Sequence, residues 1–199
     1  MQYLKEEIKN NILTAALKEF EQKGFMEASV RTIAKNAGVA LGNVYRYFKN
    51  KEELFNTIIE PAYNNLITQI PDIGKTSSAR IYKDNIFPSK YIIGFIMEVF
   101  NKYSTQLLIM IDKSKGSKFE NAKQELIDLV NAQFKNEFLP ELKENGIKLK
   151  DEYITYVIAS SFVEGFFIIL RKHKDKEKIE YLVNQLLRVF FENFVDRFK

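Results

Sequence analysis

Apolar residues in the first quarter of the chain recur at the spacing of a helix. Ile8, Ile12 and Phe20 fall on one face of the segment from residue 3 to residue 23, with Ala15 and Ala16 beside them. Gly24 follows directly, and glycine commonly ends a helix because it accepts a left-handed backbone. The pattern therefore predicts one long helix with one buried face, ending at Gly24.

Two short apolar segments follow, on either side of Gly38. Ser29 is a suitable N-cap for the first. Its apolar face consists of Val30, Ile33, Ala34 and Ala37. In the second segment Val44 and Phe48 lie four residues apart and should point inward. That leaves four residues turned outward, Leu41, Gly42, Tyr45 and Arg46, with Asn43 and Tyr47 at the flanks.

The rest of the chain also carries helical spacing. Asn50, with Glu53 three residues later, predicts the start of a helix that reaches about residue 70. Pro71, Gly74 and the residues at 76–78 indicate a loop. Further helices are expected over 89–103, 106–112, 119–142, 152–172 and 176–198, with a turn at 113–118. No alternating strand pattern and no repeat occurs, so the predicted fold class is all-α.

Composition restricts the chemistry of the chain. It has 199 residues, no cysteine, and one histidine, His173, in a charged turn. Disulfides, a cysteine nucleophile and a multi-histidine metal site are therefore excluded. No phosphate-binding glycine loop and no spaced pair of carboxylates occurs either. The sequence predicts no metal, no cofactor and no enzymatic activity.

Positive charge is concentrated at the N-terminal end. Residues 1–51 contain nine Lys and Arg against five Glu, a net charge of +4, whereas residues 52–199 contain 21 of each sign. Residues 28–51 hold five bases and no acid. Such a partition is typical of a polyanion-binding end, although a solvated basic face would look the same.

No segment predicts insertion into a membrane. The N-terminus is charged and helical, and the longest apolar run, from Tyr156 to Leu170, is interrupted by Glu164. That run is shorter than the roughly 20 residues needed to span a bilayer. We therefore expect a soluble, cytoplasmic protein.

Two short helices joined by a glycine turn, with an outward second helix and basic flanks, indicate a helix-turn-helix that binds DNA. The stretch GFMEASVRTIAKNAGVALGNVYRYFKNKEELF, residues 24–55, resembles the DNA-binding domain of the TetR family of bacterial transcriptional repressors. The resemblance covers about residues 8–55. It implies a helix-turn-helix domain at 1–50 and a helical effector-binding and dimerisation domain at 51–199, joined by a connecting helix.

The resemblance also implies roles for individual residues. Ser29, Arg31 and Thr32 would face the DNA backbone or groove edge, and Tyr47 and Lys51 would bind phosphates. Leu41, Gly42 and Tyr45 would lie along the groove, with Asn43 and Arg46 nearby. The chain departs from the family at Ala40, where Ser or Thr is common, and at Leu41, where a polar residue is common. Base recognition would then depend more on thymine methyl groups and on Arg46.

The family further implies a homodimer on a palindromic operator, released by a small molecule. The last two helices, about 152–172 and 176–198, would form the dimer interface. Their predicted contact stripes are Tyr156, Ser160, Val163 and Phe167 on one helix, and Leu182, Leu186, Val189, Phe190 and Phe194 on the other.

A lipophilic or cationic effector could contact Phe95, Glu98, Tyr103, Phe134, Phe162, Glu164 and Phe166. The aromatic residues in this set could equally fill a core. Glu164 could meet a cationic ligand, an arginine across the dimer, or water. The remaining alternative for the whole chain is a helical ligand-binding or interaction protein without specific DNA binding.

Overall fold

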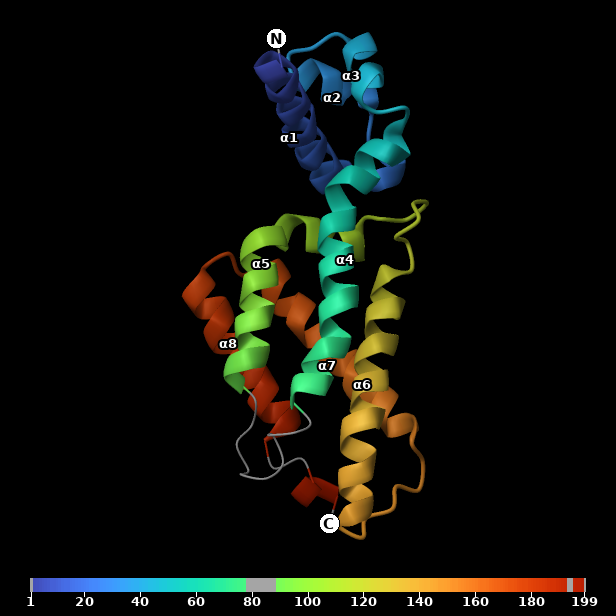
Figure 1. The fold of residues 1–199 in the computed structure, drawn as a ribbon, viewed down its shortest axis with the longest axis vertical. Helices are drawn as coiled ribbons and strands as arrows, with labels where there is room; N and C mark the ends of the chain where they lie inside the picture. The colour runs from blue at the N-terminus through green and yellow to red at the C-terminus, as the bar shows by residue number, and fades with distance from the viewer. Residues whose placement is uncertain (1, 78–88, 193–194, 199) are drawn as a thin grey trace. The chain divides into compact units, whose positions relative to one another are not determined.

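The computed structural model describes residues 2–77, 89–192 and 195–198, and these residues contain helices and no strand (Figure 1). The all-α prediction is confirmed. The elements follow the order α1 (Gln2–Glu27), α2 (Val30–Asn36), α3 (Leu41–Tyr47), α4 (Lys51–Ser77), α5 (Ser89–Asp112), α6 (Ala122–Glu144), α7 (Tyr153–Lys172), α8 (Lys176–Phe191) and the 3-10 helix η1 (Val195–Phe198).

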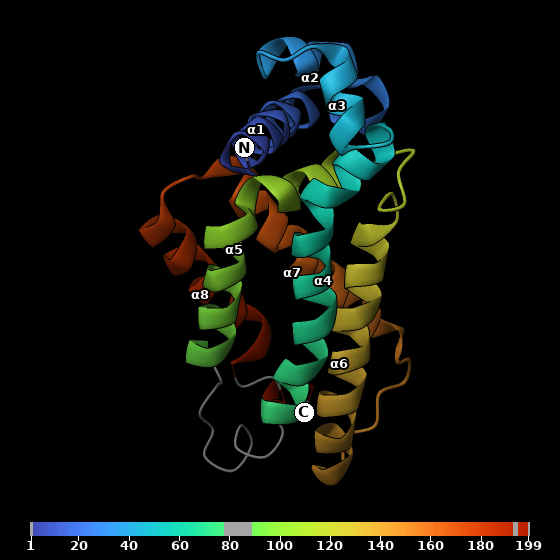
Figure 2. The same cartoon turned by 45° about the horizontal axis from the view of Figure 1, so that its top comes forward.

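The chain forms two compact units, and each unit is built from two separate stretches of the sequence. The N-terminal unit consists of Met1–Asn64 and Thr105–Lys123, and the C-terminal unit consists of Asn65–Ser104 and Gln124–Lys199. In the first, α2 packs on α1 and on α3. In the second, α7 packs on α8, and both views show α4 running between α5 and α6 (Figures 1 and 2). The functional division between residues 50 and 51 stays a prediction.

Gly24 ends the regular part of α1, as the sequence predicts. Its backbone has φ 73° and ψ 173°, a region that is essentially restricted to glycine. The next residue, Phe25, donates its N–H to the carbonyl of Lys113 at 2.8 Å. The ammonium of Lys113 in turn donates to the carbonyls of Glu21 and Gln22 near the end of the helix. Lys113, which is distant in the sequence, therefore stabilises this turn through hydrogen bonds.

Gly24→Ala should destabilise the N-terminal unit by about 1–3 kcal/mol, since alanine is strained at this φ and ψ. A Cβ atom at this position would also lie 3.2 Å from the Lys113 carbonyl oxygen. Urea unfolding followed by circular dichroism measures the change. Gly94→Ala is the matched control, because that glycine lies inside α5 and a Cβ atom there would meet no other atom within 4 Å.

The control should be stabilised by about 0.5–1 kcal/mol. Equal stability of the Gly24→Ala variant and the wild type would contradict the strained turn.

The core of the N-terminal unit is centred on Phe55, which is fully buried. Its ring lies 4.8 Å from that of Phe20, 4.9 Å from that of Phe25 and 6.3 Å from that of Phe119. Phe20 belongs to α1, Phe55 to α4, and Phe119 to the turn before α6. The aromatic cluster therefore joins the start of the chain to a segment about a hundred residues later.

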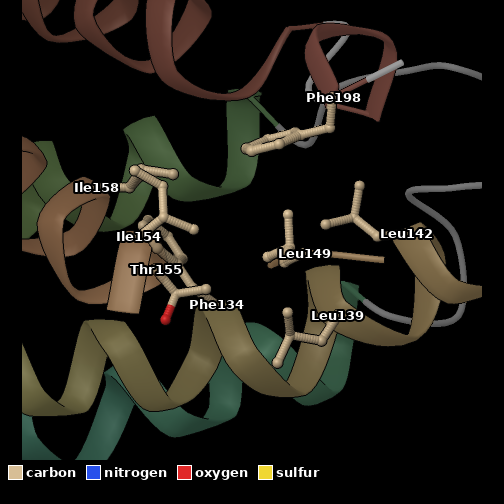
Figure 3. A pocket seen from close by; sticks show the side chains of 8 residues that line it. All are labelled: Phe134, Leu139, Leu142, Leu149, Ile154, Thr155, Ile158 and Phe198. Atoms are coloured by element: carbon tan, nitrogen blue, oxygen red, sulfur yellow. The ribbon is translucent and has the colours of Figure 1, made fainter. Parts of the chain in front are cut away.

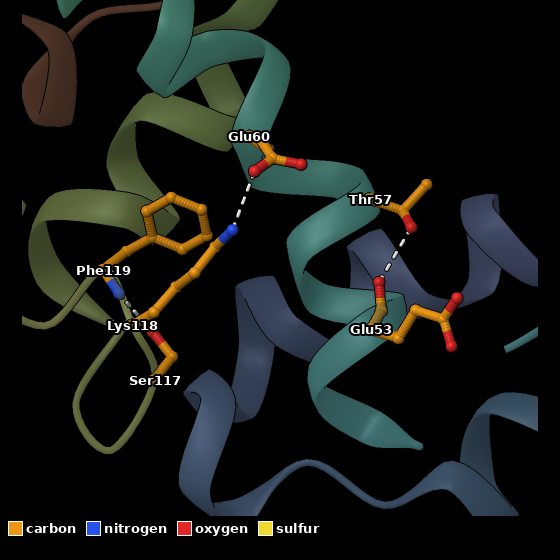
Figure 4. Close-up of polar contacts among 6 residues, drawn as sticks. All are labelled: Glu53, Thr57, Glu60, Ser117, Lys118 and Phe119. Atoms are coloured by element: carbon orange, nitrogen blue, oxygen red, sulfur yellow. Dashed lines mark hydrogen bonds and ion pairs between the residues drawn. The ribbon is translucent and has the colours of Figure 1, made fainter. Parts of the chain in front are cut away.

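Polar contacts complete this packing (Figure 4). Lys118 forms an ion pair with Glu60 of α4 at 2.7 Å, and its ammonium lies 4.9 Å from the centre of the Phe119 ring. The Ser117 hydroxyl accepts the N–H of Phe119 at 3.1 Å. Both members of the ion pair are exposed, so we expect it to contribute at most about 1 kcal/mol. The apolar ring contacts therefore provide most of the stabilisation.

Two predicted helix ends are wrong. Helix α4 continues to Ser77, through Pro71 and Gly74, where the sequence predicts a loop. One proline removes one backbone hydrogen bond but has a helical φ, so it does not by itself end a helix. Helix α8 ends at Phe191, where Glu192 is extended, and not at residue 198. The apolar spacing continues past that end in the sequence, so spacing alone could not locate it.

Helix α7 is apolar enough and long enough, at 20 residues with a mean hydropathy of 1.8, to pass a simple test for a membrane span. Within the described residues it is the one helix that does so. Its buried residues Val163, Phe167 and Leu170 face the C-terminal unit, and it packs on α8. Only 28% of the apolar window is buried in the single chain. Much of its apolar surface is therefore left uncovered.

Candidate nucleic-acid interface

Helix α2 begins at a cap that is tied to α1. The Ser29 side chain accepts the N–H of Thr32 at 3.4 Å, which confirms the predicted N-cap. The N–H of Ser29 donates at 3.1 Å to the carboxylate of Glu19, which is buried in α1. Because its oxygen accepts within the protein, the Ser29 hydroxyl can still donate its hydrogen to another acceptor such as a phosphate.

The turn between α2 and α3 is closed by backbone hydrogen bonds. Val39 donates to the carbonyl of Ala34 at 3.0 Å, and Gly38 has φ 69°, as its place in the turn predicts. Helix α3 then begins after Ala40, which makes no side-chain cap. The hydroxyl that the resemblance leads us to expect at this position is absent, so α3 begins without a side-chain cap and is positioned by the backbone of the turn and by its buried face.

That buried face is the one predicted from the sequence. Val44 is 1% exposed and Phe48 is 3% exposed. On the opposite side Tyr45 is 50% exposed, and Arg46 is exposed as well. Gly42 is also exposed, whereas three other predicted contact residues are half-buried, Leu41, Asn43 and Tyr47. Helix α3 therefore presents an aromatic and a basic side chain to solvent, and their contact with DNA stays a prediction.

The neighbouring helix adds charge to the same unit. Arg31 and Lys35 are exposed on α2, and Thr32 is half-buried beside them. Lys49 is exposed just before α4. Side chains of this kind bind phosphate oxygens in protein–DNA complexes and fix the position of the protein on the duplex.

Lys51 has a structural role that the sequence did not reveal. Its ammonium donates to the carbonyls of Met26 at 2.9 Å and Ala28 at 3.2 Å, and lies 4.9 Å from the centre of the Phe25 ring. These contacts hold the start of α4 against the turn between α1 and α2. An ammonium has three hydrogens, so two contacts leave one for a phosphate. The base directly after the Asn50 cap was the only sequence signal for this role.

The start of α4 is also capped as predicted. The Asn50 side chain accepts the N–H of Glu53 at 2.7 Å, and the Glu53 carboxylate accepts the N–H of Lys49 at 2.6 Å. Thr57 donates its hydroxyl to the Glu53 carbonyl one turn later (Figure 4). The reciprocal bonds satisfy N–H groups that a helix start otherwise leaves without partners.

Within the part of the chain that the structure describes, the predicted effector residues differ in their exposure. Phe95 and Phe134 are buried, Phe162 and Phe166 are half-buried, and Glu98 is exposed. The ring of Phe162 packs against that of Phe190 at 5.8 Å, and Phe166 against Phe167 at 5.3 Å.

Two polar members of the set have neighbours on their own helices. Glu164 forms an ion pair with Arg171 at 2.8 Å, both on α7. Tyr103 lies at a break in α5 with φ −134°, where the Lys102 ammonium is 5.1 Å from its ring centre. Glu164 is therefore paired with an arginine of its own chain, whereas the sequence analysis considered a cationic ligand, an arginine across the dimer, or water. Effector contact by any of these residues stays a prediction.

A small apolar pocket does occur in the C-terminal unit, and of the predicted residues only Phe134 lines it (Figure 3). The other lining residues are Leu139, Leu142, Leu149, Ile154, Thr155, Ile158 and Phe198. Sequence reasoning missed them because aliphatic residues near helix ends look the same whether they fill a core or line a pocket.

The predicted contact stripe on α7 is wrong in its orientation. Val163 and Phe167 are buried within the single chain and are not available to a partner. The exposed apolar residues lie on other faces, Tyr153, Ile154, Val157 and Ile168 on α7 and Tyr181 and Val189 on α8. Of the predicted stripe residues that the structure describes, only Val189 belongs to this set, and Phe194 lies outside the described residues. Periodicity finds an apolar face, but α7 has more than one, and packing decides which is covered.

Known proteins resemble this chain in its N-terminal region, and some of them resemble it over most of its length. The profile of the bacterial regulatory proteins of the tetR family matches residues 12–58. The HTH-type transcriptional regulator YhgD of Bacillus subtilis is 29% identical over 182 residues, covering 88% of this chain and 92% of that protein. IcaR of Staphylococcus epidermidis, a negative regulator of the biofilm operon icaADBC, is 22% identical over 194 residues, covering 91% and 100%.

A solved structure shares the fold. A transcriptional regulator of Aquifex aeolicus aligns with a TM-score of 0.60 over 92% of this chain and 99% of its own, at 19% identity. The profile match covers α2, α3 and the capped start of α4, which present the exposed face of Tyr45 and Arg46. The N-terminal part of the chain therefore matches the tetR family of bacterial regulatory proteins over residues 12–58, and the chain is a DNA-binding transcriptional regulator.

Proposed function

We propose that the chain is a cytoplasmic, homodimeric repressor, not an enzyme, that a small-molecule effector releases from a palindromic operator. The observation that carries this proposal is the two-sided character of α3. Val44 and Phe48 fix the helix to the core, while Tyr45 and Arg46 project into solvent. The relative IcaR is a negative regulator, which supports repression over activation.

In this proposal α3 enters the major groove and α2 crosses the DNA backbone. The exposed Gly42 lets the helix approach the base edges closely, and Leu41 and Tyr45 contact thymine methyl groups. Arg46 donates to a guanine. Ser29, Arg31 and Thr32 contact the backbone, and Tyr47 and Lys51 bind phosphates. Asn43 and Ala40 lie at the groove edge and add contacts of lower specificity.

Lys51→Ala should weaken binding to every DNA sequence alike and reduce the slope of log affinity against log salt by about one for each protomer. The physical reason is that the third ammonium hydrogen and the charge bind a phosphate, which releases a counterion. Titrations at several salt concentrations, with specific and unrelated duplexes, measure both effects.

Lys150→Ala, an exposed lysine in the C-terminal unit, is the matched control and should leave the slope unchanged. Because Lys51 also holds two carbonyls, the unfolding midpoint of each variant must be compared. An unchanged salt slope in a folded Lys51→Ala protein would rule out the phosphate contact.

We place the dimer interface on the exposed apolar side chains of α7 and α8. Val157 and Ile168 lie eleven residues apart on α7, which is close to three helical turns, so they share one face. Both are at least 43% exposed in the single chain. On α8, Tyr181 and Val189 are more than 60% exposed. Monomeric proteins seldom leave apolar patches of this kind on two neighbouring helices uncovered.

Ile168→Glu should shift the dimer to monomer, because the interface would have to bury an unpaired carboxylate. We expect at least a tenfold rise in the dimer dissociation constant, equivalent to about 1.4 kcal/mol. Sedimentation velocity over a range of concentrations measures it. Lys150→Glu is the control, because it changes the net charge by more than Ile168→Glu does but lies outside this face, and this variant should stay dimeric. Monomerisation of both variants, or of neither, would contradict the proposed interface.

The effector is proposed to bind in the C-terminal unit and to lower the affinity of the dimer for its operator. An electrophoretic shift on the intergenic DNA beside the protein's own gene tests the function directly. We expect a specific complex that unlabelled operator removes and unrelated DNA of equal length does not. If no duplex forms a specific complex, the proposal is wrong.

A further inference from the structure

Glu19 of α1 is the one charged side chain among the buried residues that the structure describes, and it is 6% exposed. It lies on the apolar face of α1, beside the core residues Ala16 and Phe20. A carboxylate in such a place costs free energy, and an apolar side chain of similar volume is often at least as stable there. The role of Glu19 therefore follows from what its carboxylate binds rather than from the stability of the core.

The carboxylate holds one side of a single peptide group. Glu19 Oε1 accepts the N–H of Ser29 at 3.1 Å, while the ammonium of Lys51 donates to the carbonyl of Ala28 at 3.2 Å. This N–H and this carbonyl belong to the same peptide bond, which is trans, so they point in opposite directions. The Ala28–Ser29 peptide is therefore held between a carboxylate of α1 and an ammonium of α4.

The same peptide is the start of α2. The carbonyl of Ser29 accepts the N–H of Ile33 at 3.0 Å, and its side-chain oxygen accepts the N–H of Thr32 at 3.4 Å. Its own N–H is donated to Glu19, so the hydroxyl hydrogen is the donor that Ser29 keeps for another molecule. Lys51 likewise keeps one of its three ammonium hydrogens. The two donors that remain for phosphates are therefore fixed by one peptide.

We propose that Glu19 is a positioning residue for DNA binding. Through the Ala28–Ser29 peptide it directs the Ser29 hydroxyl and the Lys51 ammonium towards the DNA backbone, and this role rests on the phosphate contacts of the proposed function. A carboxylate on one side of the peptide and an ammonium on the other strengthen both hydrogen bonds, because each bond is charge-assisted and polarises the other. Without the carboxylate, the peptide would be held from the side of Lys51 alone.

Net charge alone predicts the opposite effect from this proposal. Removing a carboxylate makes the DNA-binding unit more positive, which strengthens its attraction to DNA. Glu19→Leu removes the charge and the acceptor together, and it should nevertheless weaken binding to operator and unrelated duplexes alike by at least about tenfold, equivalent to about 1.4 kcal/mol. Glu19→Gln removes the charge but keeps a carbonyl oxygen, so its affinity should stay within about threefold of the wild type.

Fluorescence anisotropy with the full-length proteins at one fixed salt concentration measures these affinities, and urea unfolding shows that each variant is folded. Glu21→Leu is the matched control, because it removes an exposed carboxylate from the same helix and should bind DNA at least as tightly as the wild type. If Glu19→Leu does not fold, Glu19→Met replaces it, since a thioether is only a weak acceptor. Wild-type affinity in a folded variant without the acceptor would overturn the positioning role.

A second background shows whether Glu19 acts through these two donors. The Ser29→Ala/Lys51→Ala protein lacks both, so adding Glu19→Leu should change its affinity by less than about twofold, measured at low salt where the weaker complex still forms. A tenfold loss in this background as well would overturn the proposal, because Glu19 would then act on the unit as a whole. Absence of DNA binding by the wild type would overturn the proposed function, whereas wild-type binding that Glu19→Leu leaves unchanged would overturn this inference alone.

Discussion

Phe55→Ala should lower the free energy of unfolding by about 3–5 kcal/mol, which is within the range for large-to-small changes in a packed core. The side chain is fully buried, and it contacts rings from α1, from the turn after Gly24 and from the turn before α6. Its loss would leave a cavity where these segments meet. Since small domains are stable by only about 5–15 kcal/mol, a loss of this size removes a large share of the total stability.

Urea unfolding of both proteins, followed by far-ultraviolet circular dichroism, measures this change. Tyr45→Ala removes an aromatic ring of similar size from an exposed position on α3 and should change stability by no more than about 0.5 kcal/mol. A loss of less than about 1 kcal/mol for Phe55→Ala would show that the aromatic cluster is not the centre of the N-terminal core.

Arg46→Ala should reduce affinity for the operator by about 1–3 kcal/mol for each half-site, which is the usual contribution of a bidentate contact to a guanine. A dimer carries the substitution twice, so the total loss is about 2–6 kcal/mol if the half-sites are independent. Affinity for unrelated DNA should fall much less, because a base contact distinguishes sequences and a phosphate contact does not.

Fluorescence anisotropy with operator and unrelated duplexes at one fixed salt concentration measures both affinities. Arg31→Ala is the control, an exposed arginine of α2 that we assign to the DNA backbone. It should weaken both complexes by a similar factor. If Arg46→Ala also weakens both equally, Arg46 binds a phosphate and the base contacts of α3 lie elsewhere.

The helix-turn-helix could be predicted from the sequence because local signals agree there. Ser29, Gly38 and Asn50 each carry a side chain or a backbone freedom that places a helix end within a residue or two. Val44 and Phe48 determine the orientation of α3 by spacing alone. These signals lie close together in the sequence and leave few alternative arrangements, so the inward and outward faces of α3 follow directly from the spacing.

The long-range features could not be predicted in this way. Nothing in the neighbourhood of Lys113 indicates that it contacts the turn at Gly24, since the hydrogen bond joins segments about ninety residues apart. The same holds for Phe119, whose ring packs on Phe55 of α4. The exposed face of α7 could not be assigned by spacing, because the helix is apolar on several sides. The pocket was missed because Leu139 and Leu149 carry no chemical signature. Only packing distinguishes a buried leucine from one that lines a cavity.

Selection of binding sites from a pool of random duplexes shows whether α3 of a dimer recognises DNA sequence. We predict an enriched palindrome whose half-sites are separated by about one helical turn, or a multiple of one turn, as a two-fold dimer requires. In the Arg46→Ala protein the enrichment should weaken at the same base in both half-sites. Recovery of unselected sequences at every round, from a folded and dimeric protein, would contradict sequence recognition by α3.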